Sequence, residues 1–515
     1  MKRRAIISVY DKTGVLEIAR ALVEMGWEIV STGGTASLLR DAGVAVKEVS
    51  DVTGFPEVLR GRVKTLHPLI HAGILARRDN DFHMKDVKRL GITLVDMVCV
   101  NLYPFVEHAN RPVLPVTQVM EQVDIGGPAL LRAAAKNWQW VIPLCNPARY
   151  GEIIQKLREQ GNVDLVTRQN LAAEVFHHTA AYDAAISAYL GREWGNWPLD
   201  FPSELTFSYR RSAVLRYGEN PHQKGAYYAS LIPEPDTLAG FRVIHGKEIS
   251  FNNLLDADAA WGLVTEFSEP AACIIKHASP CGAAVAKTPG QAFEKAYEGD
   301  PVSAFGGIVA FNRRLEEEDA LSMKKCFIEM VLAPGYTEQA LEVLKKKKDL
   351  RIAFMPDPKE GKLPSYSVRQ VLGGILVQER DRRLPKDEDW NVVSEKKPTP
   401  EELKDLAFAM TVAKHVKSNA VVLAKGMMTV GIGGGQPNRV DAVRIAVNRA
   451  GERAGGACMA SDGFFPFPDS VEEAARAGVT AIAAPGGSIR DSESVEAANR
   501  LGVSLVFTGT RHFLH

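Results

Sequence analysis

The chain has 515 residues, and its formal net charge is zero because 62 Lys and Arg balance 62 Asp and Glu. Apolar residues make up 46% and charged residues 24%, which is ordinary usage for a globular protein. The length exceeds what one hydrophobic core usually serves, so we expect about two to four domains. The zero balance argues against a nucleic-acid binder, which would carry a basic field, but it excludes no small anionic ligand.

Cysteine usage and apolar runs bear on the compartment. The six cysteines are scattered and form no CxxC pair, which predicts neither a disulfide framework nor a zinc ribbon and favours a reducing cytosol. The amino-terminal segment MKRRAIISVYDKTG has too short an apolar stretch for a signal peptide. No window approaches the ~20 apolar residues of a membrane span. We therefore expect a cytoplasmic protein that makes no use of a membrane.

The first 190 residues alternate strand and helix signals. Short apolar runs predict strands, and apolar residues at helical spacing predict helices between them. Such alternation is typical of a parallel sheet with helices on both faces, an α/β fold. A tight turn is expected at Gly33-Gly34. The predicted strands are 5–10, 27–32 and 95–105, and the predicted helices are 15–26, 35–43 and 164–190, the last as one long helix or a pair.

Two irregular stretches suggest how the chain is divided. Residues 191–205 are rich in Gly, Trp and Pro and lack periodicity, so we interpret them as a linker. The alternating pattern restarts after them, and a Pro- and charge-rich stretch at 385–402 separates two halves of this second region. We therefore expect one domain over 1–190 and a second over 206–515. No repeat of fixed period is evident.

Turns that come after predicted strands offer a first candidate site. The sequence Thr32-Gly33-Gly34-Thr35 lies between a strand and a helix, where free backbone N–H groups and the helix dipole attract an anion. The turn at residues 10–14 also comes after a strand, and such turns converge at the carboxyl edge of a parallel sheet. Many Gly-Gly turns only connect elements, so this signal is weak by itself.

A second candidate is the loop at residues 61–68, GRVKTLHP. Its two cations, Arg62 and Lys64, and the hydroxyl of Thr65 suit a phosphate or a developing anion, although solvated charges are an equal alternative. His67 and His71 have the i, i+4 spacing of a metal face, but no HExxH motif or third ligand accompanies them, which favours structural histidines. Further polar residues at apparent strand and helix ends are Asn101, Tyr103, Asp124, Ile125, Gly126, Gly127 and Lys136.

A third candidate is the segment IIKHASPCG at residues 274–282. Lys276 and His277 come after a buried strand and face a predicted Pro-Gly turn. An ammonium beside an imidazole favours its neutral form, which can accept a proton at pH 7. No base that could activate Cys281 as a nucleophile is evident in the sequence, so we interpret Cys281 as a packing residue. The segment 431–436, GIGGGQ, departs from the dinucleotide fingerprint at Gln436, and NAD binding is rejected.

These motifs together resemble the family of bifunctional purine biosynthesis enzymes, the AICAR transformylase/IMP cyclohydrolases. The resemblance runs essentially end to end, and the motifs fall in family order. They are SVYDKTG, STGGTA, GFPEVLRGRVKTLHP, HAGILARR, VNLYPF, DIGGPALLRAAAKN, LRYGENPHQ, FNNLLDADAAW, KHASPCG, SAFGGIVA, ASDGFFPF, APGGSIRD and TRHF.

The resemblance implies a fold and two reactions. It implies an amino-terminal cyclohydrolase domain of methylglyoxal-synthase-like α/β fold, and a transformylase of two cytidine-deaminase-like halves without the deaminase zinc. The transformylase moves a formyl group from the co-substrate 10-formyltetrahydrofolate to the 5-amino group of AICAR, giving FAICAR. The cyclohydrolase closes FAICAR to IMP with loss of water.

The resemblance also implies roles for individual residues. Formyl transfer is assigned to His277 as base and Lys276 as the cation that stabilises the oxyanion. Ring closure is assigned to Lys64, Tyr103, Asp124 and Lys136. The cyclohydrolase nucleotide cradle comprises Tyr10, Asp11, Lys12, Thr32, Gly33, Gly34, Thr35, Arg62, Thr65, Asn101, Ile125, Gly126 and Gly127. AICAR contacts of the transformylase are Arg216, Tyr217, Asn253, Gly306, Glu329, Asn419, Arg439 and Arg511, with Phe513 and His515 beside them. Folate contacts are Phe305, Val440, Phe464, Ser488 and Ile489.

The same resemblance implies an oligomeric state and a bound ion. It implies a homodimer whose transformylase sites use both chains, and a structural potassium ion near Ser418 and Asp462. Two other classes stay open at this point. Methylglyoxal-synthase-like domains elsewhere only sense effectors, and the chain could be a monofunctional transformylase with a decayed first domain. Retention of Lys64, Tyr103, Asp124 and Lys136 argues against both alternatives.

Overall fold

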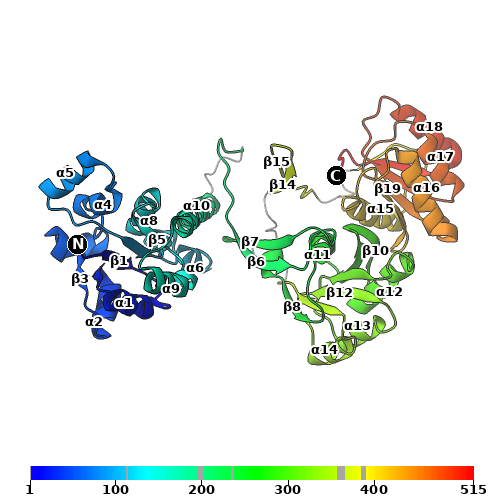
Figure 1. Ribbon diagram of the computed structural model, residues 1–515. Helices are drawn as coiled ribbons and strands as arrows, with labels where there is room; N and C mark the ends of the chain where they lie inside the picture. The colour runs from blue at the N-terminus through cyan, green and yellow to red at the C-terminus, as the bar shows by residue number, and fades with distance from the viewer. Residues whose placement is uncertain (1, 112–113, 195–200, 234–236, 357–365, 384–389) are drawn as a thin grey trace. The chain divides into compact units, whose positions relative to one another are not determined.

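The computed structural model describes residues 2–111, 114–194, 201–233, 237–356, 366–383 and 390–515 (Figure 1). The chain divides into two compact units. The amino-terminal unit comprises residues 1–210 with 230–232, and the carboxy-terminal unit comprises 211–229 with 233–515. Among the described residues, no helix is both long and apolar enough to cross a membrane.

The amino-terminal unit is built on a five-stranded parallel sheet with the strand order β3-β2-β1-β4-β5. Its central strands are almost wholly buried and apolar, as expected for strands covered on both faces. The strands are β1 (Arg4–Ser8), β2 (Glu28–Ser31), β3 (Lys47–Glu48), β4 (Met97–Val100) and β5 (Ile142–Leu144). The helices are α1 (Val15–Glu24), α2 (Gly33–Asp41), α3 (Val49–Thr53), α4 (Pro68–Leu75), α5 (Asp81–Arg89), α6 (Phe105–Ala109), α7 (Val116–Met120), α8 (Gly126–Lys136), α9 (Tyr150–Gln160) and α10 (Leu165–Trp194).

Most of the elements predicted in this unit are confirmed, with three differences. β1, α1, β2 and the single long helix α10 lie where the sequence places them. The helix after β2 begins at Gly33 instead of residue 35. The strand predicted at 95–105 ends at Val100, because Asn101 turns its amide toward the loop after β1 and α6 begins at Phe105. Of the predicted linker, residues 191–194 belong to α10, and residues 195–200 lie outside the described part of the chain.

The carboxy-terminal unit contains two six-stranded sheets. The first has the order β10-β9-β11-β12-β13-β8 and the second the order β16-β21-β20-β19-β17-β18. The first half comprises β8 (Arg242–His245), α11 (Phe251–Val264), β9 (Ala271–Lys276), β10 (Ser279–Val285), α12 (Pro289–Gly299), β11 (Gly307–Phe311), α13 (Glu317–Ser322), β12 (Ile328–Ala333), α14 (Glu338–Lys345) and β13 (Arg351–Phe354). The second half comprises β16 (Asn391–Val392), α15 (Pro400–Ala413), β17 (Val421–Ala424), β18 (Thr429–Gly433), α16 (Arg439–Ala450), β19 (Cys458–Ser461), α17 (Asp469–Arg476), β20 (Ala481–Ala484), α18 (Asp491–Leu501) and β21 (Ser504–Phe507).

The two halves repeat one topology. Each runs strand, helix, hairpin, helix, and then three strands joined by two helices. In each sheet three neighbouring strands run parallel to one another, β11-β12-β13 in the first sheet and β19-β20-β21 in the second. The remaining strand pairs are antiparallel. Two smaller hairpins are formed by β6 (Tyr209–Leu215) with β7 (Gly225–Ser230) and by β14 (Tyr366–Val371) with β15 (Gly374–Glu379). The stretch predicted to divide the halves, 385–402, lies partly outside the described residues and otherwise contains β16 and the start of α15.

The halves share one apolar core. Helices α11 and α15 both contribute to it, and the ring of Phe267, just beyond α11, stacks on that of Phe408 within α15 with centroids 5.4 Å apart. The sheets meet at their edge hairpins, where Ala284 of β10 bridges to Met428 beside β18. Burial of apolar surface on both faces of α11 and α15 fixes the halves to each other.

Candidate functional site

Loops that come after β1 and β4 form the centre of the amino-terminal site. The strand order reverses between these two strands, which is where ligands bind in open parallel sheets. The Asn101 side-chain oxygen accepts hydrogen bonds from the backbone N–H groups of Tyr10 (2.6 Å) and Asp11 (2.9 Å). Its amide nitrogen donates to the Asp11 carbonyl at 2.9 Å. Asn101 therefore locks the two loops together.

Lys12 and Thr35 connect this centre to the start of α2. The Lys12 ammonium donates to the Thr35 hydroxyl at 2.8 Å, and the same hydroxyl accepts from the Val9 backbone N–H at 3.1 Å. Burial lowers the pKa of Lys12 despite the nearby charge of Asp11. Hydrogen bonds from Thr13 lower the pKa of Asp11. The sequence thus places a cation and a carboxylate on one short turn.

Lys64 reaches the same place from the loop at 61–65. Gly33 has a φ of 46°, and a Cβ built there would lie 3.0 Å from the Lys64 ammonium nitrogen. That nitrogen also lies 3.3 Å from a carboxylate oxygen of Glu57. Arg62 differs, because its guanidinium pairs with Glu121 at 2.8 Å on an exposed surface. The structure therefore brings Lys64, but not the Arg62 head group, to the first turn of α2.

Asp124 and the start of α8 complete the amino-terminal site. One Asp124 oxygen accepts from the Gly127 backbone N–H at 2.8 Å, and the Asp124 N–H donates to the Tyr182 hydroxyl at 2.9 Å. Burial raises the pKa of Asp124, although backbone N–H groups oppose it. A Cβ built at Gly126 would lie 2.9 Å from the Thr65 hydroxyl, so only a glycine allows this approach.

Most residues predicted for ring closure and its cradle thus gather at one edge of the sheet. The rings of Tyr10 and Tyr103 meet edge to face with centroids 6.1 Å apart, and both are exposed. Lys136 is the exception. It is the last residue of α8, so about 15 Å of helix separates its Cα from that of Gly126 at a rise of about 1.5 Å per residue.

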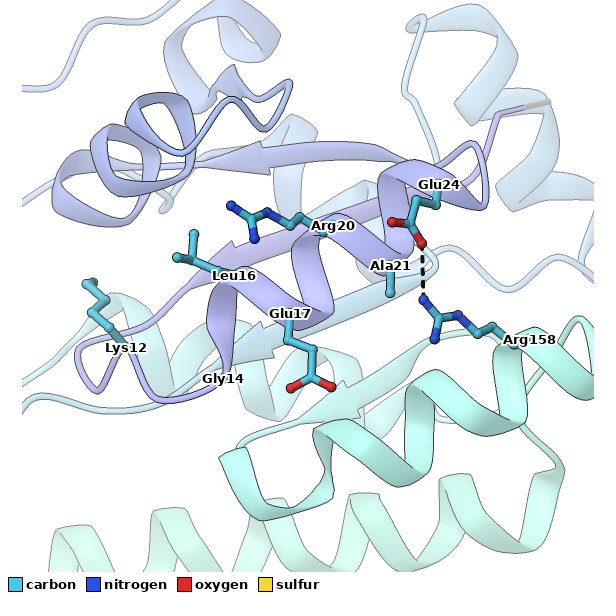
Figure 2. Close-up of a pocket in the computed structure, with 8 residues that line it drawn as sticks. All are labelled: Lys12, Gly14, Leu16, Glu17, Arg20, Ala21, Glu24 and Arg158. Atoms are coloured by element: carbon cyan, nitrogen blue, oxygen red, sulfur yellow. Dashed lines mark hydrogen bonds and ion pairs between the residues drawn. The ribbon is translucent and has the colours of Figure 1, made fainter.

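Two other features of this unit do not belong to the cluster. His67 accepts a hydrogen bond from the Leu69 N–H at 3.2 Å and caps α4, so its role is structural as expected. Figure 2 shows a hollow beside α1, where Glu24 pairs with Arg158 of α9 at 3.1 Å. Of the residues that line it, only Lys12 is predicted to bind the nucleotide. Within the described ranges, no three His, Cys, Asp or Glu side chains are grouped to hold a metal ion.

The tip of the hairpin β9-β10 carries Lys276 and His277. The hairpin turn consists of His277 and Ala278, both with positive φ (54° and 55°), whereas the predicted Pro-Gly turn is wrong: residues 279–285 form β10. This is the geometry of a two-residue hairpin turn, in which glycine and asparagine are preferred. His277 projects into solvent. Cys281 is half-buried, and burial raises the pKa of its thiol to about 12, which agrees with packing.

Lys276 is held by the segment that precedes β11. Its ammonium donates to the carbonyl oxygens of Phe305 (3.1 Å) and Gly306 (2.9 Å). Gly306 has a φ of 68°, and a Cβ there would lie 3.1 Å from the same nitrogen. The Phe305 ring is largely exposed and packs on Phe327 with centroids 4.8 Å apart. Lys276 therefore has a fixed head group with one N–H left free for a ligand.

Three further residues lie at this edge of the first sheet. Asn253 caps α11 and contacts Glu329 of β12 at 3.4 Å. Asp256, which was not among the residues predicted for the site, accepts from the Ala278 N–H at 2.6 Å. Asn252 donates to the Glu219 carbonyl at 3.2 Å, which anchors the loop that carries Arg216 and Tyr217. Asp256 lies within the motif FNNLLDADAAW, but the motif does not distinguish its role from that of Asp258.

A second cluster surrounds Arg439 at the start of α16. Its guanidinium is buried, donates to the Asn419 side-chain oxygen (2.6 Å) and to the Ser461 hydroxyl (2.8 Å), and forms an ion pair with Asp462. Asp462 also accepts from the Ser418 hydroxyl. The Asp462 carboxylate is thus already neutralised by the Arg439 guanidinium. These side chains are therefore poorly suited to the potassium ion that the resemblance implies near Ser418 and Asp462.

The carboxy-terminal residues lie against this second cluster. The Arg511 guanidinium lies 4.4 Å and that of Arg439 5.9 Å from the Phe513 ring centroid. The Phe513 and His515 rings meet at 5.8 Å. His512 pairs with Asp381 at 2.6 Å and fixes the tail. Of the predicted folate contacts, Val440 is next to Arg439, Phe464 comes after β19, and Ser488 and Ile489 lie in the loop after β20.

The glycines at residues 431–436 have a packing role. A Cβ at Gly431 or Gly433 would lie 2.1 Å or 2.0 Å from a backbone carbonyl oxygen of α16. These glycines therefore allow β18 to pack closely on α16. This gives the glycine run a structural reason independent of any dinucleotide.

Comparisons with known proteins match two family models to consecutive parts of the chain. The family model described as "AICARFT/IMPCHase bienzyme" matches residues 134–449, and the one described as "MGS-like domain" matches residues 14–129. A solved structure titled "Crystal structure of ForH" covers 37% of this chain and 99% of its own at 36% identity, with a TM-score of 0.34.

Similar curated proteins span the whole chain. Proteins named "Bifunctional purine biosynthesis protein PurH" are 52% identical in Anoxybacillus flavithermus, 50% in Desulfitobacterium hafniense and 49% in Acetivibrio thermocellus. Each alignment covers 100% of this chain and 100% of the relative. The chain therefore belongs to the AICARFT/IMPCHase bienzyme family, and it is a bifunctional enzyme of purine biosynthesis.

Proposed function

We propose that the two activities are divided between the two units. The carboxy-terminal unit transfers the formyl group of 10-formyltetrahydrofolate to the 5-amino group of AICAR, and the amino-terminal unit closes the product FAICAR to IMP. The observation that carries this proposal is the pair Lys276-His277, with an exposed imidazole and a fixed ammonium on one hairpin. The polar cluster around Asn101 and Asp124 supplies the separate second site.

Formyl transfer needs a base because the AICAR amine is conjugated with a carboxamide-bearing ring and is a poor nucleophile. His277 accepts the amine proton as the new C–N bond forms. Lys276 donates its free N–H to the oxyanion of the tetrahedral adduct, and its other two contacts prevent reorganisation. The adduct then collapses: the bond between the formyl carbon and the folate nitrogen breaks, that nitrogen takes up the proton held by His277, and FAICAR and tetrahydrofolate leave.

Nucleotide and folate contacts of this step come from several elements. Arg216 and Arg511 are exposed guanidinium groups that suit the AICAR phosphate. Arg439 is buried in its pair with Asp462, and we assign it to holding Asn419 toward the ligand. The remaining AICAR contacts are Tyr217, Asn253, Gly306, Glu329, Phe513 and His515, and the folate contacts are Phe305, Val440, Phe464, Ser488 and Ile489.

Ring closure joins the carboxamide nitrogen to the formyl carbon, and the adduct loses water. Lys64 stabilises charge on the formyl oxygen, while Asp124 and Tyr103 orient the reacting amide. The backbone N–H groups at the start of α2 and Lys12 receive the phosphate. Lys136, the last residue of α8, is assigned to the proton of the reacting amide.

One assay tests the division of labour. The protein is incubated with AICAR and 10-formyltetrahydrofolate, and FAICAR and IMP are measured over time. We expect FAICAR to appear first and IMP to accumulate after it. FAICAR without IMP would indicate a monofunctional transformylase, and absence of both products would indicate a binding module.

We further propose a homodimer in which each transformylase site is completed by the partner. The support is that, within the described residues, no hydrogen bond or ion pair joins the Lys276 cluster to the Arg439 cluster. Mixed dimers of His277→Ala and Asn419→Ala chains test this. Shared sites predict recovery of about half of the wild-type activity per mixed dimer, because one site regains both residues. No recovery would place each complete site within one chain.

A further inference from the structure

Among the described residues, one side chain outside the hairpin forms a hydrogen bond with the turn that carries His277. Asp256, in the second turn of α11, accepts a hydrogen bond from the Ala278 backbone N–H at 2.6 Å. Asp256 is half-buried, and burial raises its pKa while the charges of His277 and Lys276 lower it and that of Glu329 raises it. The Asp256 carboxylate therefore contacts the turn of the proposed catalytic pair and lies close to the charges of both residues.

The second half of the unit contains a matched copy of this arrangement. Asp405 occupies the equivalent position in α15, six residues after the capping Thr399, as Asp256 is six residues after the capping Ser250. Its two oxygens accept from the backbone N–H groups of Gly426 (2.8 Å) and Met427 (2.7 Å). These two residues form the β17-β18 turn with φ values of 63° and 59°.

The lysine contact is repeated as well. Lys425 precedes that turn as Lys276 precedes its own, and its ammonium donates to the Gly455 carbonyl at 2.9 Å. A Cβ at Gly456, which has a φ of 72°, would lie 3.2 Å from this nitrogen. The corresponding value for Gly306 and Lys276 is 3.1 Å. The carboxylate, the turn and the lysine are therefore properties of the repeat, and the imidazole is not, because Gly426 stands where the first half has His277.

We infer that Asp256 is a positioning residue for formyl transfer, which fixes the His277-Ala278 turn so that the imidazole meets the AICAR amine. This inference rests on the proposed function, in which His277 is the base. Asp405 holds an equivalent turn that carries no reactive group. The chain therefore offers a control for the structural part of the contact.

The experiment compares Asp256→Ala with Asp405→Ala in the full-length enzyme, with steady-state formyl transfer and thermal unfolding as readouts. For Asp256→Ala we expect kcat to fall about 10²-fold with the KM for AICAR changed less than about threefold, since a misplaced group loses rate before it loses binding. Asp405→Ala should lower the unfolding temperature to a similar extent and leave kcat within about twofold. Asp256→Asn keeps an acceptor oxygen in place and should restore most of kcat.

Other outcomes overturn the inference. It fails if Asp256→Ala keeps its kcat, if Asp405→Ala loses as much, or if Asp256→Asn is as slow as Asp256→Ala. Should Asp256→Ala not fold, Asp256→Glu replaces it, because the longer side chain displaces the oxygens while the charge remains, and the same loss of kcat is expected. The His277→Ala variant distinguishes failure of the proposed function from failure of this inference. If His277→Ala retains formyl transfer, His277 is not the base, independently of the result for Asp256.

Discussion

His277 and Ala278 both adopt the left-handed backbone conformation, which costs about 1–2 kcal/mol for each residue that carries a Cβ. The surrounding structure imposes it: Ser279 pairs with Lys276 in the hairpin, and Asp256 binds the turn from α11. Strain of this kind persists where the surrounding structure over-determines the conformation. Here it exposes His277 at the tip of the hairpin, directly after the fixed Lys276 in the sequence.

Removal of that imidazole separates the two activities. His277→Ala is expected to lower kcat for formyl transfer by about 10²–10⁴-fold, the usual contribution of a general base. Cyclisation of supplied FAICAR should be unchanged, because the proposed site for that step lies in the other unit. Both rates are measured on the same preparation. Loss of both with the fold intact would refute the assignment of two sites.

A substitution at Gly33 tests whether the close approach of the Lys64 ammonium to this residue matters for ring closure. Gly33→Ala places a Cβ in a left-handed residue and 3.0 Å from the Lys64 ammonium, so we expect slower FAICAR cyclisation, by about tenfold or more if about 1.4 kcal/mol of binding or transition-state stabilisation is lost. Gly43→Ala is the matched control, because Gly43 also has a positive φ (75°) and no atom lies within 4 Å of its Cβ position. Equal effects of the two variants would contradict a specific role of the Gly33–Lys64 approach.

At the scale of elements, the carboxyl ends of α11 and α15 are joined by a buried ionic contact. Glu266 lies just beyond α11, and its carboxylate pairs with Lys414 (2.8 Å) and His415 (2.8 Å), which lie just beyond α15. Burial raises the pKa of Glu266, but the two partners outweigh it, and the net effect is a lowered pKa. The contact adds charged hydrogen bonds of defined geometry to an otherwise apolar interface between the halves.

This contact predicts how stability depends on pH. Glu266→Gln is expected to lower the free energy of unfolding at pH 7 by about 3–5 kcal/mol, because it leaves the buried Lys414 ammonium without its partner. A lowered pKa in the folded state means that the stabilisation is present above the unfolded value of about 4.3 and is lost as the pH falls through the folded one. The difference between variant and wild type should therefore shrink below about pH 4 in denaturant titrations. The exposed Glu401→Gln serves as control, and an equal loss there would contradict the argument.

At the scale of the whole molecule, the proposed function assigns one site to each unit, with FAICAR as the product of the first reaction and the substrate of the second. Asp124→Ala removes the acceptor that orders the start of α8 and should abolish cyclisation while formyl transfer continues. A mixture of Asp124→Ala and His277→Ala enzymes should therefore convert AICAR to IMP, although neither variant does so alone. Chromatographic detection of IMP, with a lag after FAICAR, checks this. Failure of the mixture would show that the sites cannot work from separate molecules.

Sequence patterns were reliable where one element's own residues decide its form. β1, α1, β2 and α10 are explained by apolar spacing and glycine stops, and the strand-end turns that gather around Asn101 are explained by parallel-sheet geometry. Motif resemblance also indicated Lys276 and His277. These signals are local, because each depends on residues a few positions apart.

Zero net charge over 515 residues argued against a nucleic-acid binder, and the motifs along the chain indicated the family. Tertiary structure alone decided the rest. It placed Lys136 at the far end of α8, buried Arg439 against Asp462, and made residues 279–285 a strand. It also revealed two halves of one topology, in which Asp256 and Asp405 hold equivalent turns. The physical reason is that such contacts join segments distant in sequence, and their energy depends on burial and approach that no local pattern encodes.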